Sequence, residues 1–133
     1  MNSVTCLGDF TTADTIYVPF ATYGSNNESI TITGLAATDI EIYKNGSTTQ
    51  RSSDAGYTLL DTDGTNFDSI TGIHGFSIDL SNNSHAGFYA NGFQYWIVVS
   101  AITVNSQTVS FVYYFRIGFT ALLTLQEAKS PQS

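Results

Sequence analysis

The stretch Phe93–Ile117, FQYWIVVSAITVNSQTVSFVYYFRI, decides the fold class of this chain. Apolar and aromatic residues alternate along it with a period of two, which is the periodicity of a β-strand and not of a helix. The pair Asn105-Ser106 interrupts the run with two small polar residues, which are typical of a tight turn. The stretch therefore predicts a β-hairpin with long strands over Phe93–Val104 and Gln107–Ile117.

Both predicted strands of this hairpin are apolar on both faces. In the first strand, strict alternation separates Tyr95, Ile97, Val99 and Ala101 from Trp96, Val98, Ile102 and Val104. In the second strand it separates Val109, Phe111, Tyr113, Phe115 and Ile117 from Val112 and Tyr114. A strand of a β-sandwich has only one face in its own core. The second face is therefore covered by a loop or terminal tail of the same chain, or by another subunit, and Trp96, Val98, Val112 and Tyr114 are the interface candidates.

Shorter segments with the same period of two precede the hairpin. Predicted strands cover Thr15–Tyr23, Ser29–Thr33, Thr38–Lys44, Thr48–Arg51, Tyr57–Asp61 and Gly75–Leu80. Asn45-Gly46 is a strong hairpin signal because both residues tolerate positive φ, and Pro19 marks an edge strand or a bulge. About eight strands at short spacing predict an all-β fold: a single antiparallel β-sandwich, immunoglobulin-like or jelly-roll-like, with terminal arms. The predicted boundaries are an N-terminal arm over 1–13, a sandwich domain over 14–118 and a C-terminal tail over 119–133.

The charge balance narrows the classes of partner. The chain has 133 residues and a net charge of −7, with 11 acidic and 4 basic side chains. Nucleic acids and anionic membrane surfaces both require basic clusters, which these few cations do not form, so we expect neither as a partner. The N-terminus does not resemble a signal peptide. Charged residues are only 11% of the chain, and the neutral hydroxyls and amides that replace them lose less on burial than ions do, which favours protein–protein packing.

No motif in the sequence predicts catalysis, a metal or a cofactor. Asp61, Asp63 and Asp68 lie in an oxygen-rich loop around Gly64, but their spacing does not match an EF-hand, so they are only weak calcium candidates. His74 and His85 are in no ligand motif and are expected at the surface or at strand edges. The lone Cys6 falls in an N-terminus expected to be flexible, with no scaffold for a nucleophile. We therefore expect a protein that is not an enzyme.

The aromatic residues allow two interpretations. Tyr57, Tyr89, Tyr95, Trp96 and Tyr113 are expected mainly in the core, but exposed rings could instead form a sugar-stacking platform. The segment His85–Trp96 (HAGFYANGFQYW) is similar to the strand-connecting corner of immunoglobulin-like domains, where a tyrosine has a structural role.

A family resemblance extends over Asp14–Gly118. It is carried, in order, by ADTIYVPF (Ala13–Phe20), TITGLAATDIEIYKNGSTTQR (Thr31–Arg51), GYTLLDTDGTNFD (Gly56–Asp68), TGIHGFSIDLSNN (Thr71–Asn83) and AGFYANGFQYWIVVSAITVNSQTV (Ala86–Val109). These segments resemble small virion proteins of tailed bacteriophages. The resemblance implies a structural protein made in the host cytoplasm and located in the virion, with copies of itself and a major capsid or tail protein as partners. The implied role is capsid decoration or cement; the alternative is a tail, fibre or baseplate module that acts as an adaptor or carbohydrate-binding adhesin.

Overall fold

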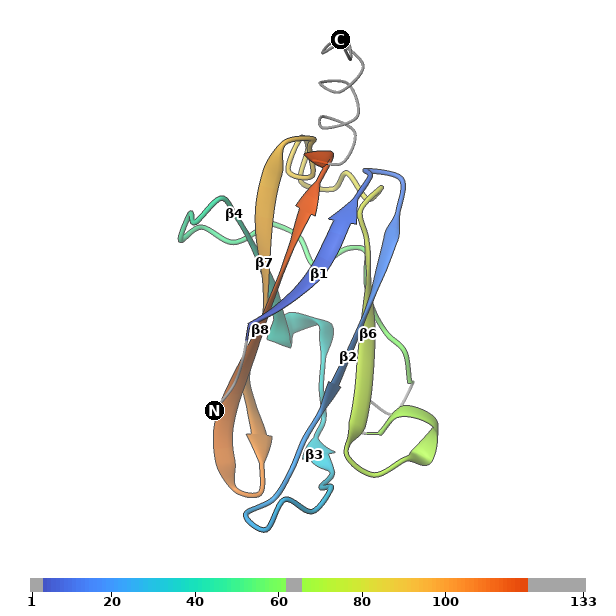
Figure 1. Ribbon diagram of the computed structural model, residues 1–133, viewed down its shortest axis with the longest axis vertical. Helices are drawn as coiled ribbons and strands as arrows, with labels where there is room; N and C mark the ends of the chain where they lie inside the picture. Colours follow the sequence, from blue (N-terminus) through green and yellow to red (C-terminus); the bar gives the residue numbers. More distant parts are fainter. Residues whose placement is uncertain (1–3, 62–65, 120–133) are drawn as a thin grey trace, which may run out of the picture.

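The computed structural model describes residues 4–61 and 66–119, and in this part of the chain it contains two β-sheets (Figure 1). The larger sheet, sheet A, has five strands, in which β7 lies between β8 and the two short strands β3 and β4, and β1 pairs with the other edge of β8. Its strands are β1 (Thr5–Phe10), β3 (Ile32–Thr33), β4 (Ile40–Lys44), β7 (Phe93–Val104) and β8 (Gln107–Ile117). Sheet B has three strands in the order β2-β6-β5: β2 (Thr15–Ala21), β5 (Tyr57–Leu59) and β6 (Ile73–Asp79). The prediction of an all-β, sandwich-like fold is confirmed.

The long hairpin has the predicted strands and the predicted turn. β7 and β8 are antiparallel, and the pair Val104↔Gln107 closes the turn. Asn105 and Ser106 have φ of 51° and 63°, the left-handed conformation that a two-residue turn needs to match the twist of its strands.

Because β7 contains a β-bulge, the predicted assignment of its side chains to the two faces is wrong beyond Val99. Val99 pairs with Phe111 and Ile102 pairs with Val109, so two residues of β7, Ser100 and Ala101, lie opposite the single residue Ser110. Ala101 has φ of 54°, and its N–H donates to the Ser110 hydroxyl at 2.9 Å. An extra residue reverses the alternation beyond it.

The reversal moves two apolar side chains into the core. Ile102 and Val104, predicted to share a face with Trp96, are instead buried on the same face as Val99, and Ala101 is exposed. Strict alternation failed here because a bulge depends on backbone pairing and leaves no residue-type signature at Ser100-Ala101.

The N-terminal strand was not predicted. Residues 5–10 of the predicted arm form β1, which pairs in parallel with β8 through Thr5↔Tyr113, Cys6↔Tyr114 and Phe10↔Ile117. Sheet A is therefore mixed and not wholly antiparallel. Conversely, the predicted strand Thr48–Arg51 contributes only the isolated bridge Tyr43↔Gln50.

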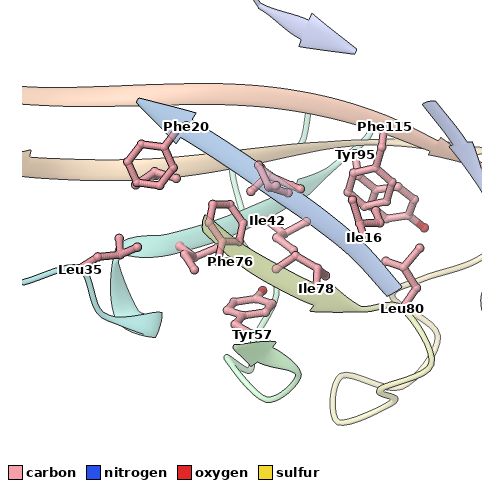
Figure 2. Packing of buried hydrophobic residues seen from close by; sticks show 14 of the residues in the cluster. Ile16, Phe20, Leu35, Ile42, Tyr57, Phe76, Ile78, Leu80, Tyr95 and Phe115 are labelled. Carbon is pink, nitrogen blue, oxygen red and sulfur yellow. The ribbon is translucent and has the colours of Figure 1, made fainter. Parts of the chain in front are cut away.

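The core lies between the inner faces of the two sheets (Figure 2). Sheet B contributes alternate residues of β2 and β6, and sheet A contributes alternate residues of β4, β7 and β8. The members that are at most 2% exposed are Ile16, Val18, Ile40, Ile42, Phe76, Ile78, Leu80, Tyr95, Ile97, Val99, Phe115 and Ile117. Pro19 lies in β2, an edge strand, as predicted.

Tyr95 stabilises the loop that precedes β7 through hydrogen bonds of its hydroxyl group. Its ring stacks on Phe115 at 5.0 Å between centroids, and its hydroxyl donates to the Phe88 carbonyl at 2.7 Å. The Ala90 N–H donates back to the same hydroxyl at 2.8 Å. The tyrosine of the predicted corner therefore has a structural role, since it satisfies buried backbone groups of a loop that lacks strand partners.

Candidate interaction surface

The four interface candidates lie together on the outer face of sheet A. Trp96 pairs with Tyr114 across β7 and β8, and Val98 pairs with Val112 in the next row. On the β4 side, Tyr43 pairs with Trp96; on the β1 side, Cys6 pairs with Tyr114. We call Tyr43, Trp96, Val98, Val112 and Tyr114 the Trp96 surface.

Side-chain exposure distinguishes this surface from the core face of the same strands. The neighbours of Trp96 along β7, Tyr95 and Ile97, are fully buried, whereas Trp96 is 48% exposed. Val98, Val112 and Tyr114 are half-buried. The chain thus covers this face only in part, and its indole, phenol and aliphatic side chains are of the types that are enriched at the cores of protein interfaces.

Two phenol hydroxyls on this face are hydrogen-bonded to neighbouring side chains. The Tyr43 hydroxyl donates to Glu41 Oε2 at 2.6 Å, and this hydrogen bond raises the pKa of Tyr43. A hydrogen bond with Cys6 raises the pKa of Tyr114. Both phenols are therefore neutral at physiological pH, and Glu41 places a carboxylate beside Val98 at one edge of the surface.

The two histidines occupy different environments. His74, predicted at the surface or at a strand edge, is instead only 4% exposed in β6, the central strand of sheet B. Its Nε2 lies 2.7 Å from the Thr22 hydroxyl, which donates its single proton to the Ile30 carbonyl at 2.6 Å. Nε2 must therefore donate to Thr22, a structural role that ties sheet B to the segment preceding β3. His85 is half-buried in a loop, where Nδ1 accepts from the Ser52 N–H at 3.0 Å.

The acidic loop is only partly described. Asp61 Oδ2 accepts from the Asp68 N–H at 2.8 Å, an arrangement that stabilises the turn. Asp63 lies outside the described residues. Within residues 4–61 and 66–119, no three His, Cys, Asp or Glu side chains are grouped so that they could hold a metal ion.

The predicted aromatic set does not form one platform. Tyr95 is fully buried and Tyr57 is 8% exposed, which confirms the core interpretation for both. The Tyr113 hydroxyl donates to the Pro19 carbonyl across the two sheets at 3.1 Å. Of the five, only Trp96 is an exposed residue, at 48%, and it lies on the opposite face of β7 from Tyr95.

Arg51 is a buried cation whose role no sequence pattern predicted. It is 2% exposed, and its guanidinium donates to the carbonyls of Ser53, Ala55 and Asn82 and to Asn82 Oδ1, at 2.6 to 3.2 Å. The group also lies over the Tyr89 ring at 5.0 Å. Arg51 therefore joins two irregular loops and is not available to bind a phosphate.

A second apolar surface, also missed from the sequence, lies on the outer side of sheet B. A groove of about 290 Å³ is lined mainly by Tyr17, Pro19, Leu60, Phe67 and Gly75. These residues come from separate segments, and no local pattern in the sequence brings them together.

Comparison of the chain with models of known protein families and with curated proteins found no match. In the described part of the chain, no helix is long and apolar enough to cross a membrane.

Proposed function

We propose that this protein is a non-enzymatic structural subunit of a tailed-phage virion, and that it binds neighbouring subunits through the Trp96 surface. The most specific form of the proposal is a capsid decoration or cement protein. The alternative is a tail, fibre or baseplate module that acts as an adaptor or carbohydrate-binding adhesin. An immunoglobulin-like or jelly-roll-like arrangement of the sandwich is part of the proposal.

The observation that carries the binding role is the exposure of Trp96 within a row of aromatic and aliphatic side chains. Burying apolar area stabilises a complex by about 25 cal/mol per Å². A surface of a few hundred Å² therefore supplies several kcal/mol, part of which offsets the loss of translational and rotational freedom. Such contacts are weak singly and become strong when a particle repeats them.

The virion assignment rests on the resemblance of Asp14–Gly118 to small phage virion proteins. The dominance of hydroxyl and amide side chains over charges also supports a surface that packs against other proteins. The adhesin alternative is favoured by one observation: Trp96 offers an exposed ring to a sugar.

Quantitative mass spectrometry of gradient-purified phage particles tests the virion assignment. We expect the chain to co-purify with particles in many copies, and immunogold labelling to place it on the head. Labelling of the tail would favour the alternative. Recovery of the chain only in the particle-free lysate would contradict both forms of the proposal.

A further inference from the structure

The groove on sheet B lies beside a glycine of the central strand β6. Gly75 lies in the central strand β6, opposite Pro19 of β2, on the outer side of the sheet. A Cβ at this position would lie 3.0 Å from Leu60 Cδ1, which is closer than ordinary van der Waals contact. Glycine therefore lets the Leu60 side chain pack down onto β6, and Leu60 forms one wall of the groove.

The walls of the groove are apolar and accessible. Tyr17 is 66% exposed, Phe67 41% and Leu60 38%. Monomeric soluble proteins seldom expose contiguous apolar patches larger than a few hundred Å², and their largest patches often have a function. The groove therefore has the composition of a docking site for an apolar side chain.

The two sheets pack through their inner faces, so their outer faces point in opposite directions. One of these faces carries the exposed indole of Trp96, and the other carries an apolar hollow of about 290 Å³. A contact between two Trp96 surfaces would set the indole against another row of side chains, Tyr43, Trp96 and Tyr114. In the groove, the indole of Trp96 would instead enter a hollow between aromatic side chains, where offset or edge-to-face contacts with Tyr17 and Phe67 are favourable.

We propose that the groove binds the Trp96 surface of a second copy of this chain, so that copies join head to tail. This inference rests on the proposed function, because it takes the Trp96 surface as the binding face. Unlike a two-fold contact, a head-to-tail contact uses two different patches and leaves one of each free at the ends of every open oligomer. Such a contact builds rings or chains, which suits a subunit repeated on a particle.

The exposed apolar area of the groove predicts that each contact between two copies is weak. The exposed fractions of Tyr17, Phe67 and Leu60 correspond to roughly 300 Å² of apolar surface, given that an aromatic side chain buries about 150–250 Å². A stable interface buries about 800 Å² per partner. Association is therefore expected at high protein concentration, or where other contacts hold the copies close together.

Mixing two variants tests the head-to-tail arrangement. Trp96→Asp removes the inserted side chain and leaves the groove intact, whereas Tyr17→Asp places a charge in the groove wall and leaves the Trp96 surface intact. Tyr23→Asp is the matched control, because Tyr23 is 57% exposed and lines neither surface. Sedimentation velocity is measured over a concentration series, and circular dichroism checks each fold. Trp96→Ser and Phe67→Glu replace any variant that does not fold.

We expect the wild type and Tyr23→Asp to associate without stopping at a dimer, and each surface variant alone to stay monomeric. An equimolar mixture should then form a heterodimer, because the groove of Trp96→Asp accepts the Trp96 surface of Tyr17→Asp, and the mass should rise about twofold and no further. If Tyr17→Asp associates as the wild type does, or if the mixture stays monomeric, the inference is overturned while the Trp96 surface keeps its proposed role. A wild type that stays monomeric at every concentration would overturn the inference and leave a different protein as the partner of the Trp96 surface.

Discussion

Substitutions at Ala101 test the β-bulge that sets the inner face of β7. In a regular exposed strand position, valine is more stabilising than alanine, and alanine more than glycine, over a range of about 1 kcal/mol. Ala101 instead has φ of 54°, where glycine is free of strain and a β-branched residue is a steric outlier. The bulge therefore predicts the reverse order of stability: glycine, then alanine, then valine.

The magnitudes follow from the backbone conformation. A left-handed conformation costs a residue with a Cβ about 1–2 kcal/mol. Glycine recovers that cost but loses about 0.4–1 kcal/mol through the greater entropy of its unfolded chain. Ala101→Gly should therefore raise the free energy of unfolding by about 0.5–1 kcal/mol, and Ala101→Val should lower it by about 1 kcal/mol or more.

Urea unfolding followed by tryptophan fluorescence measures this series, since the single Trp96 lies in the same strand. The slope of the free energy against urea concentration should stay constant, because the substitutions leave the buried area unchanged. If valine proves more stable than alanine and glycine less stable, β7 is regular at this point. Ile102 and Val104 would then not share the face of Val99, and the account of the core would be wrong.

Two further predictions concern buried polar groups. Arg51→Met should lower the free energy of unfolding by about 2–4 kcal/mol, because it leaves the carbonyls of Ser53 and Ala55 and the side chain of Asn82 without their donor. Arg116→Met, at an exposed arginine, is the control and should lower the free energy of unfolding by less than about 1 kcal/mol. An equal loss of stability in both variants would refute the role of Arg51. Burial raises the pKa of Tyr113 to about 12, so its phenol loses a proton at lower pH in the unfolded chain than in the folded one. The contribution of Tyr113 to stability should therefore be constant below pH 10 and fall between about pH 10 and 12. In Tyr113→Phe, this fall, measured by thermal unfolding at pH 9 to 12, should be smaller than in the wild type, and an unchanged fall would contradict the burial.

The sequence predicts what local patterns determine. The period of two in Phe93–Ile117 and the turn at Asn105-Ser106 are local signals, and the bounds of both hairpin strands match the prediction residue for residue. Alternation likewise predicts that Ile40 and Ile42 point inward, and both are fully buried.

Features that depend on pairing between distant segments could not be predicted. Thr5–Phe10 contains a glycine and an aspartate and has no clear alternation, and it becomes a strand only because β8 offers an open edge. His74 is buried because Thr22, far away in the sequence, accepts its proton. The apolar residues of the groove are also distant in sequence, and only sheet B and the loop beside it bring Tyr17 close to Leu60 and Phe67.

The Trp96 surface could be predicted in part. Alternation separates Trp96, Val98, Val112 and Tyr114 from the core face correctly, since all four lie on the same side of the bulge. It wrongly adds Ile102 and Val104, which lie beyond the bulge. It also misses Tyr43, whose place beside Trp96 depends on the register of β4 against β7.

Sedimentation equilibrium of the wild type and of Tyr114→Asp tests most directly whether the Trp96 surface drives association. A few hundred Å² of apolar contact, reduced by the cost of association, gives dissociation constants on the order of 0.1–1 mM. The weight-average mass of the wild type should therefore rise toward millimolar concentration. Tyr114→Asp should stay monomeric with an unchanged circular dichroism spectrum, and Thr103→Asp, an exposed control in the same strand as Trp96, should associate as the wild type does. A wild type that stays monomeric over the whole range, together with unfolding of Tyr114→Asp, would contradict the account.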